Sequence, residues 1–199
     1  MAIPYLFQYA NAMSKRVTNR HKAYDLAANN FGVVTTSMAQ DVGIPPVELR
    51  KLVQRGALDR IGRGVYRVPF MPVSKHSDII ETLKIVGEDA YLVGTSVLSF
   101  LDIGVFNPRK FQVSTPRRIR KALPPHVEVE YASRKPVREY EGVPCESVYS
   151  ALSSVLGCTM SDRFSSALRQ ARERGLLDAR EYRLLVMAQK KESLGNMAA

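Results

Sequence analysis

The order of apolar and polar residues predicts helices in the first part of the chain. Apolar side chains recur at helical spacing in residues 3–13 and again in residues 19–31, where Gly32 provides a stop. Val33 and Val34 then form a short apolar pair that predicts an extended segment. We therefore expect two amphipathic helices followed by the beginning of a strand.

Residues 35–55 carry the pattern of a helix-turn-helix. Thr35 or Thr36 can cap a helix over residues 37–41, and Gly43 can adopt the positive φ of a tight turn. Pro45 and Pro46 are typical of the start of a second helix, which we expect to run to about residue 55. The side chains expected to face inward are Met38, Ala39, Val42, Ile44, Leu49 and Leu52.

Two short alternating segments follow, over residues 57–61 and 65–68, joined by Gly62-Arg63-Gly64. This arrangement predicts a two-stranded hairpin, the wing of a winged helix. Prolines at positions 69 and 72 prevent regular structure from continuing, so we expect a domain boundary there.

The remainder of the chain mixes both periodicities. Helical spacing covers residues 76–87, 95–101, 146–156, 161–174 and 179–190, and strand-like alternation covers residues 91–93, 111–114 and 127–131. The predicted fold class is α+β, with an N-terminal winged helix-turn-helix followed by a mixed α/β C-terminal domain. The expected parts are a helical extension (1–18), the winged helix-turn-helix (19–70), a linker (71–74), the C-terminal domain (75–191) and a flexible tail (192–199).

Charge points to a partner class. The 199 residues include 29 Lys and Arg against 19 Asp and Glu, and residues 1–70 hold ten of these cations against four of the acids. A positive surface attracts phosphates and releases their counterions, which makes nucleic acid the first candidate partner, although the charge alone is also compatible with a merely soluble protein. No apolar run approaches the ~20 residues of a spanning helix. We expect no membrane association and a cytoplasmic location.

The second helix of a helix-turn-helix lies in the DNA major groove. The side chains predicted to face outward from it are Pro46, Val47, Arg50, Lys51 and Gln54. Arg50 can pair with a guanine, Gln54 can pair with an adenine and Val47 can touch a thymine methyl group. Lys51 and Arg55 are expected to meet phosphates.

The wing and the start of the first helix complete the predicted DNA-binding set. The wing contributes Arg60, Arg63 and Arg67, of which Arg63 lies at the tip and could enter the minor groove or hold a phosphate. Thr36 is included at the start of the first helix. Two alternatives stay open: the cations of the second helix form an ordinary solvated face, or the wing contacts a protein.

A second basic cluster consists of Arg117, Arg118, Arg120 and Lys121. Auxiliary phosphate binding, docking of an acidic partner and a solvated loop are all compatible with it. Evidence for catalysis is thin: the residue after Gly94 is Thr rather than the Lys of a phosphate-binding loop, and neither His nor Cys residues have metal-ligand spacing. We expect no enzymatic activity, no metal and no cofactor.

Several of these segments together resemble the AbiEi family of bacterial antitoxins. The similarity rests on residues 32–36, 52–58 and 63–67, and continues in residues 94–98, 142–147, 151–152, 167–171 and 175–178. The resemblance implies a winged helix that binds inverted repeats in the protein's own promoter and represses a two-gene operon. It also implies a C-terminal domain that counteracts a nucleotidyltransferase toxin.

One rival function stays open at this point. In it, the chain is a protein-interaction module that sequesters the toxin directly, and DNA binding is secondary. The sequence does not distinguish a monomer from a homodimer, nor direct from indirect neutralisation.

Overall fold

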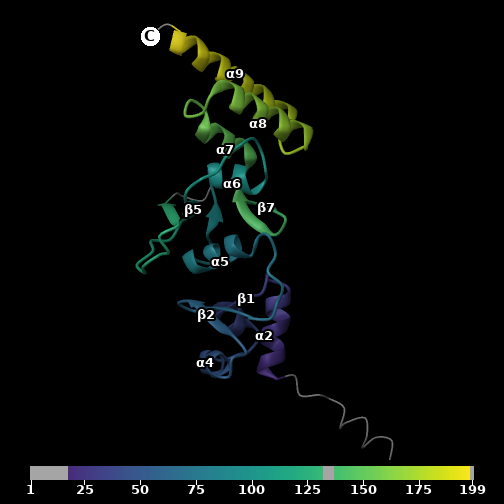
Figure 1. Cartoon of the computed structure of the whole chain (residues 1–199), viewed down its shortest axis with the longest axis vertical. Coiled ribbons are helices and arrows are strands. Elements are labelled where there is room, and N and C mark those ends of the chain that lie inside the picture. Colours follow the sequence, from purple (N-terminus) through teal and green to yellow (C-terminus); the bar gives the residue numbers. More distant parts are fainter. Residues whose placement is uncertain (1–17, 132–136, 198–199) are drawn as a thin grey trace, which may run out of the picture. The chain divides into compact units, whose positions relative to one another are not determined.

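The computed structural model describes residues 18–131 and 137–197, with side chains up to residue 194 (Figure 1). The helix predicted over residues 3–13 lies outside these residues. The chain divides into two compact units, the first ending at Ser77 and the second beginning at Asp78. Helices and strands occur in both, so the fold is α+β as predicted.

The first unit contains the predicted helix-turn-helix and wing. Its elements are α2 (Asn19–Ala28), β1 (Val33–Thr35), α3 (Thr36–Asp41), α4 (Pro46–Gln54), β2 (Asp59–Gly62) and β3 (Val65–Arg67). β3 pairs antiparallel with both β1 and β2, which gives a sheet of order β1-β3-β2. The wing hairpin is thus extended by the strand that leads into α3.

Helix α2 is shorter than the periodicity predicted. It ends at Ala28, and Phe31 has a φ of 53°, which a continuing helix does not allow. The amide side chains of Asn29 and Asn30 donate to the carbonyl oxygens of Asp25 and Leu26, at 3.0 and 2.8 Å. These two asparagines satisfy the last carbonyl groups of the helix and so end it early.

The core of the first unit gathers around α2, α3 and α4. Ala39, Ile44 and Leu49 are completely buried and Leu52 is nearly so, as predicted. Val42 was predicted to face inward, and that prediction is wrong: it is 36% exposed. Val42 follows the last residue of α3 and acts as its C-cap, and the inward place in the turn is taken by Ile44.

The second unit packs helices on a five-stranded sheet. Its elements are α5 (Ser77–Val86), β4 (Tyr91–Leu92), α6 (Thr95–Phe100), β5 (Phe111–Thr115), β6 (Val127–Tyr131), β7 (Val137–Tyr140), β8 (Val143–Glu146), α7 (Val148–Val155), α8 (Ser161–Glu173) and α9 (Ala179–Met197). The strand order is β6-β5-β4-β8-β7. β5 and β6 are parallel, as are β4 and β8, and the other neighbours are antiparallel.

The hairpin of β7 and β8 was not predicted. Pro144, within β8, argues against an internal strand because proline donates no hydrogen bond to a neighbouring strand. Its place is tolerated because β4 has only two residues and pairs with β8 at Leu92 and Cys145 alone. The helix predicted from Glu146 begins at Val148 instead, and Ser147 caps it by accepting from Ser150 N.

Helix α9 continues to Met197. The predictions that it ends at Lys190 and that a flexible tail begins at residue 192 are therefore wrong for the residues up to 197. Gln189 anchors the helix to α8, because its side-chain amide donates to Ser161 and Ser165 at 2.8–3.1 Å. Ser193 then donates to the Gln189 carbonyl within the following turn. Residues 190–197 contain no proline, so no backbone N–H that the helix requires is missing in this stretch.

Candidate nucleic-acid interface

The helix-turn-helix presents α4 with one buried and one exposed face. Leu49 and Leu52 point into the core, and Val47 is 50% exposed on the other side. Arg50, Lys51 and Gln54 are exposed as well, and with Val47 they have the i, i+3, i+4, i+7 spacing of a single helical face. Of the five side chains predicted to face outward, four are exposed and Pro46 is half-buried, and their contacts with DNA stay a prediction.

The turn between α3 and α4 is held by α2. Gly43 has a φ of 77°, a conformation that favours glycine, and the Lys22 ammonium donates to the Val42 carbonyl at 3.0 Å. This bond satisfies a carbonyl at the C-terminal end of α3, where a positive charge also interacts favourably with the helix dipole. Lys22 was not predicted from the sequence, because nothing local indicates that its partner lies twenty residues away.

An acid lies beside the cations of α4. Lys51 donates to the Glu48 carboxylate at 2.7 Å, and this bond lowers the pKa of the Glu48 carboxyl below its ordinary value. A second hydrogen bond to the Asn19 side chain acts in the same direction. Lys51 therefore has an intramolecular partner, whereas Arg50 is exposed and does not belong to this ion pair.

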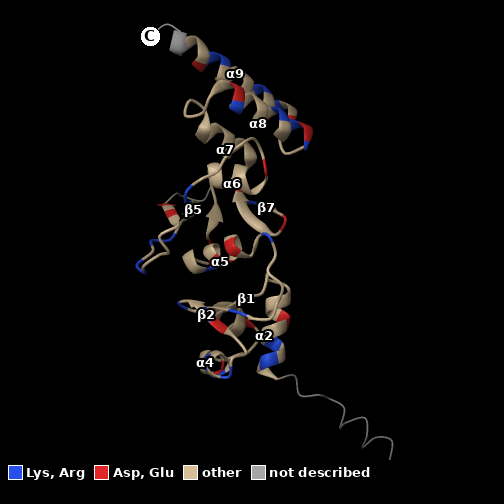
Figure 2. Cartoon of the chain, viewed as in Figure 1, with Lys and Arg blue, Asp and Glu red and all other residues tan. Residues whose placement is uncertain are grey.

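The three wing arginines have different surroundings. Arg60 donates to the Gly62 carbonyl at 3.3 Å, and Arg67 lies 3.8 Å from the Asp59 carboxylate. Arg63 is exposed in the turn that joins β2 to β3. Figure 2 shows basic residues at the end of this hairpin and on α4, within the same unit.

Thr36 contacts the wing rather than pointing freely to solvent. Its hydroxyl donates to the Gly64 carbonyl at 3.3 Å, and its backbone N–H donates to the same oxygen at 2.8 Å. Thr35 provides the helix cap instead, by accepting from Met38 N at 3.2 Å. Thr35 therefore caps α3, whereas Thr36 binds the wing turn.

The second basic cluster lies in the crossover between β5 and β6. Arg117, Arg118 and Arg120 are exposed and Lys121 is half-buried. The Arg117 guanidinium forms an ion pair with Asp89 at 2.7 Å, which anchors the first residue of the cluster to the loop before β4.

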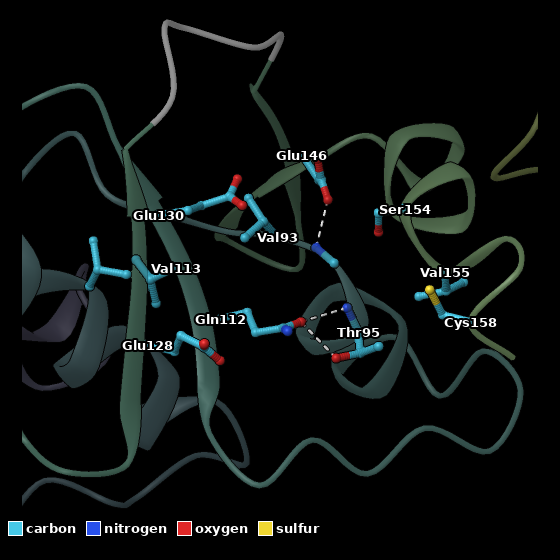
Figure 3. A pocket seen from close by; sticks show the side chains of 12 residues that line it. Val93, Thr95, Gln112, Val113, Glu128, Glu130, Glu146, Ser154, Val155 and Cys158 are labelled. Atoms are coloured by element: carbon cyan, nitrogen blue, oxygen red, sulfur yellow. Dashed lines mark hydrogen bonds between the residues drawn. The ribbon is translucent and has the colours of Figure 1, made fainter.

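A cavity of about 410 Å³ lies in the second unit, over β5 and β6 and beside the ends of α6 and α7 (Figure 3). Its lining residues are Val93, Gly94, Thr95, Gln112, Val113, Glu128, Val129, Glu130, Glu146, Ser154, Val155 and Cys158. Glu128 and Glu130 face the same side of their strand and are exposed.

The polar groups at one side of this cavity bind each other. The buried Glu146 accepts from Gly94 N at 2.6 Å and from the Ser150 hydroxyl at 2.7 Å. Gln112 Oε1 accepts from Thr95 N and Thr95 Oγ1, at 2.9 and 2.6 Å. A carboxylate thus takes the backbone N–H that a phosphate-binding loop would offer to its ligand, which agrees with the absence of such a loop in the sequence.

None of the helices in residues 18–131 and 137–197 is long and apolar enough to cross a membrane. The same residues contain no group of three or more His, Cys, Asp or Glu side chains arranged to hold a metal ion.

A helix-turn-helix followed by a hairpin wing, with its second helix exposing cations, defines the first unit as a winged helix-turn-helix domain. Residues 21–69 match the model of a family described as "Transcriptional regulator, AbiEi antitoxin". The match covers about a quarter of the chain and lies within the winged helix-turn-helix, so the first unit is similar to the DNA-binding domain of that family. No curated protein matches the chain.

Proposed function

We propose that this protein binds operator DNA through its winged helix, represses its own operon and counteracts a nucleotidyltransferase toxin through its second unit. The observation that carries the DNA-binding part is the exposed face of α4, on which Val47, Arg50, Lys51 and Gln54 lie at helical spacing. The antitoxin part is supported by the family description and by the resemblance to AbiEi proteins.

In this proposal α4 enters the major groove. Arg50 donates two hydrogen bonds to O6 and N7 of a guanine, Gln54 pairs with an adenine edge and Val47 contacts a thymine methyl group. Lys51 and Arg55 meet phosphates, and Arg63 at the wing tip reaches a phosphate or the minor groove. Base contacts then give sequence preference, and phosphate contacts give affinity that falls with salt.

The first test is a titration of the whole protein against duplex DNA from directly upstream of its gene. A scrambled duplex serves as competitor, and the titration is repeated at several salt concentrations. Binding that survives the competitor supports a sequence-specific regulator. Equal, weak binding to both duplexes would contradict the proposal and favour a protein-interaction module.

Two kinds of variant separate the two kinds of contact. Arg50→Ala should weaken specific binding by roughly 1–3 kcal/mol and relax the preference at one base pair. Lys51→Ala and Arg63→Ala should weaken binding to every duplex similarly and lower the salt slope. Arg169→Ala, which removes an exposed arginine from α8, is the control and should change neither quantity.

The antitoxin role is tested in cells that express the downstream toxin. The whole chain should restore growth, and Arg50→Ala should restore it equally while losing repression of a promoter fusion. Failure of the whole chain to restore growth would contradict the antitoxin role. Copurification at moderate salt then separates direct sequestration, which gives a stable complex, from indirect neutralisation, which gives none.

The remaining features of the proposal follow from its DNA target. Inverted repeats in the operator would place two copies of the chain on one duplex, as monomers or as a homodimer. We also propose that the protein acts in the cytoplasm, where the operon DNA lies.

A further inference from the structure

The wing turn has a defined backbone conformation and a contact outside the hairpin. β2 and β3 pair up to Gly62 and Val65, which leaves Arg63 and Gly64 as the turn. Gly64 has a φ of 75°, whereas Arg63 is not among the described non-glycine residues with positive φ. Gly62 likewise is not among the glycines with positive φ, and the register shifts between Arg60 and Gly62. These features fit a three-residue hairpin loop that is closed by a glycine in the left-handed conformation.

The outside contact comes from the first residue of α3. The Thr36 hydroxyl and the Thr36 backbone N–H both donate to the Gly64 carbonyl, at 3.3 and 2.8 Å. The Thr36 side chain also lies close to the Gly64 backbone, because a Cβ atom added to Gly64 would lie 3.0 Å from Thr36 Oγ1. One oxygen of the wing turn is thus fixed to the helix that packs against α4.

This contact connects the two parts of the domain that the proposed function assigns to DNA. Thr36 begins α3, whose Ala39 is completely buried in the core shared with Leu49 of α4. Gly64 directly follows Arg63, the exposed arginine of the turn. A change in the Thr36 contact therefore moves Arg63 relative to α4 without touching any side chain of the exposed α4 face.

We propose that Thr36 is a positioning residue, which holds the wing turn so that Arg63 and α4 reach the same DNA duplex together. The proposal rests on the proposed function and deepens it, because it assigns Thr36 an effect through Arg63 rather than a DNA contact of its own. Thr36 and Gly64 act as a pair, in which the glycine supplies both the required φ and the space for the threonine.

The test uses the whole protein, the upstream duplex and three substitutions at one position. Thr36→Val keeps the branched shape and the backbone N–H but removes the hydroxyl donor, and should weaken binding about three- to tenfold. Thr36→Ser keeps a hydroxyl and should restore most of the affinity. Ser37→Ala removes an exposed hydroxyl one residue further along α3 and should leave affinity unchanged.

A double-mutant cycle distinguishes positioning from direct contact. If Thr36 acts through Arg63, Thr36→Val should have almost no effect in an Arg63→Ala background. An undiminished effect in that background would overturn the proposal and indicate that Thr36 contacts DNA by itself. Equal affinity of Thr36→Val and wild-type protein would also overturn it.

A measurement without DNA keeps the proposal separate from the proposed function. In ¹⁵N relaxation experiments, Thr36→Val should lower the order parameters of the Arg63 and Gly64 amides and leave those of α4 unchanged. Unchanged order parameters at the turn would refute the positioning role even if the wild-type protein binds DNA. If the wild-type protein shows no sequence preference, the proposed function fails and the relaxation data alone decide the role of Thr36.

Discussion

Gly94 lies where a strand turns directly into a helix, and its replacement gives a sharp test of the second unit. The residue has φ 57° and ψ −136°, a region that glycine occupies and side chains avoid. Its N–H donates to the buried Glu146 at 2.6 Å. A Cβ at this position would lie 2.7 Å from Gln112 Oε1, closer than real Cβ contacts come.

The expected cost of Gly94→Ala has two sources. The backbone conformation costs about 1–3 kcal/mol for any residue with a Cβ. Gln112 must also move away, and it then loses its hydrogen bonds to Thr95 N and Thr95 Oγ1, at about 1 kcal/mol each. We therefore expect a total loss of about 3–5 kcal/mol.

Gly175 supplies a matched control in the same unit. It also has a positive φ, 68°, but no atom lies within 4 Å of a Cβ added there. Gly175→Ala therefore carries only the backbone cost, about 1–2 kcal/mol. The two backbone costs are not identical, so a Gln112→Ala background isolates the contact with Gln112.

Calorimetry of the whole chain measures both variants, and hydrogen exchange in peptides from α7 assigns the transition to the second unit. At about 4 °C per kcal/mol, Gly94→Ala should lower the Tm of that unit by roughly 12–20 °C and Gly175→Ala by roughly 4–8 °C. In a Gln112→Ala background, Gly94→Ala should cost only its backbone contribution. Equal shifts for Gly94→Ala and Gly175→Ala would refute the reasoning.

Three further predictions concern the charge beside Lys51 and the two cysteines. Glu48→Gln removes the negative charge that pairs with Lys51, so affinity for any duplex should rise and its salt dependence should steepen; an unchanged salt slope would show that the ion pair does not limit Lys51. Cys158 is exposed and should react with a thiol reagent in the folded protein, whereas the buried Cys145 should react only after unfolding. Burial raises the pKa of Cys145 from 9.0 to about 12, so the folded state favours the neutral thiol and stability falls as pH rises from about 9 towards 12. Urea titrations should give a loss of about 1.4 kcal/mol per pH unit in that range, beyond the loss in Cys145→Ala; identical pH dependence of the two proteins would exclude this thiol as the cause.

The winged helix could be predicted because its signals are local. Glycines, prolines and threonines mark each boundary, and Gly43 and Gly64 both have the positive φ that their turns require. The errors in this unit are local too. Val42 was predicted to face inward from spacing alone, although a C-cap residue leaves the helical path. The predicted end of α2 was too late in the chain, because the capping by Asn29 and Asn30 depends on their side-chain rotamers.

The sheet of the second unit could be predicted only in pieces. The segments of β5 and β6 alternate clearly, but their parallel pairing requires the crossover that contains Arg117–Lys121, and nothing in either strand specifies it. β7 and β8 were missed because Pro144 obscures the pattern. The hydrogen bond between Glu146 and Gly94 could not be predicted, because Gly94 lies 52 positions earlier in the chain.

The same long-range bonds limit what the cavity of the second unit can do. Gly-Thr-Ser before a helix superficially suggests anion binding, yet Gly94 N already donates to a carboxylate and Thr95 N to Gln112. A nucleotide phosphate would have to displace Glu146 from Gly94 N and would also meet the negative charges of Glu128 and Glu130 across the cavity. Neutralising a nucleotidyltransferase by sequestering its nucleotide substrate is therefore disfavoured at this site. If the second unit counteracts such a toxin, we expect it to act through its surface, and variants of Glu146 that reduce antitoxin activity should do so in proportion to their loss of stability.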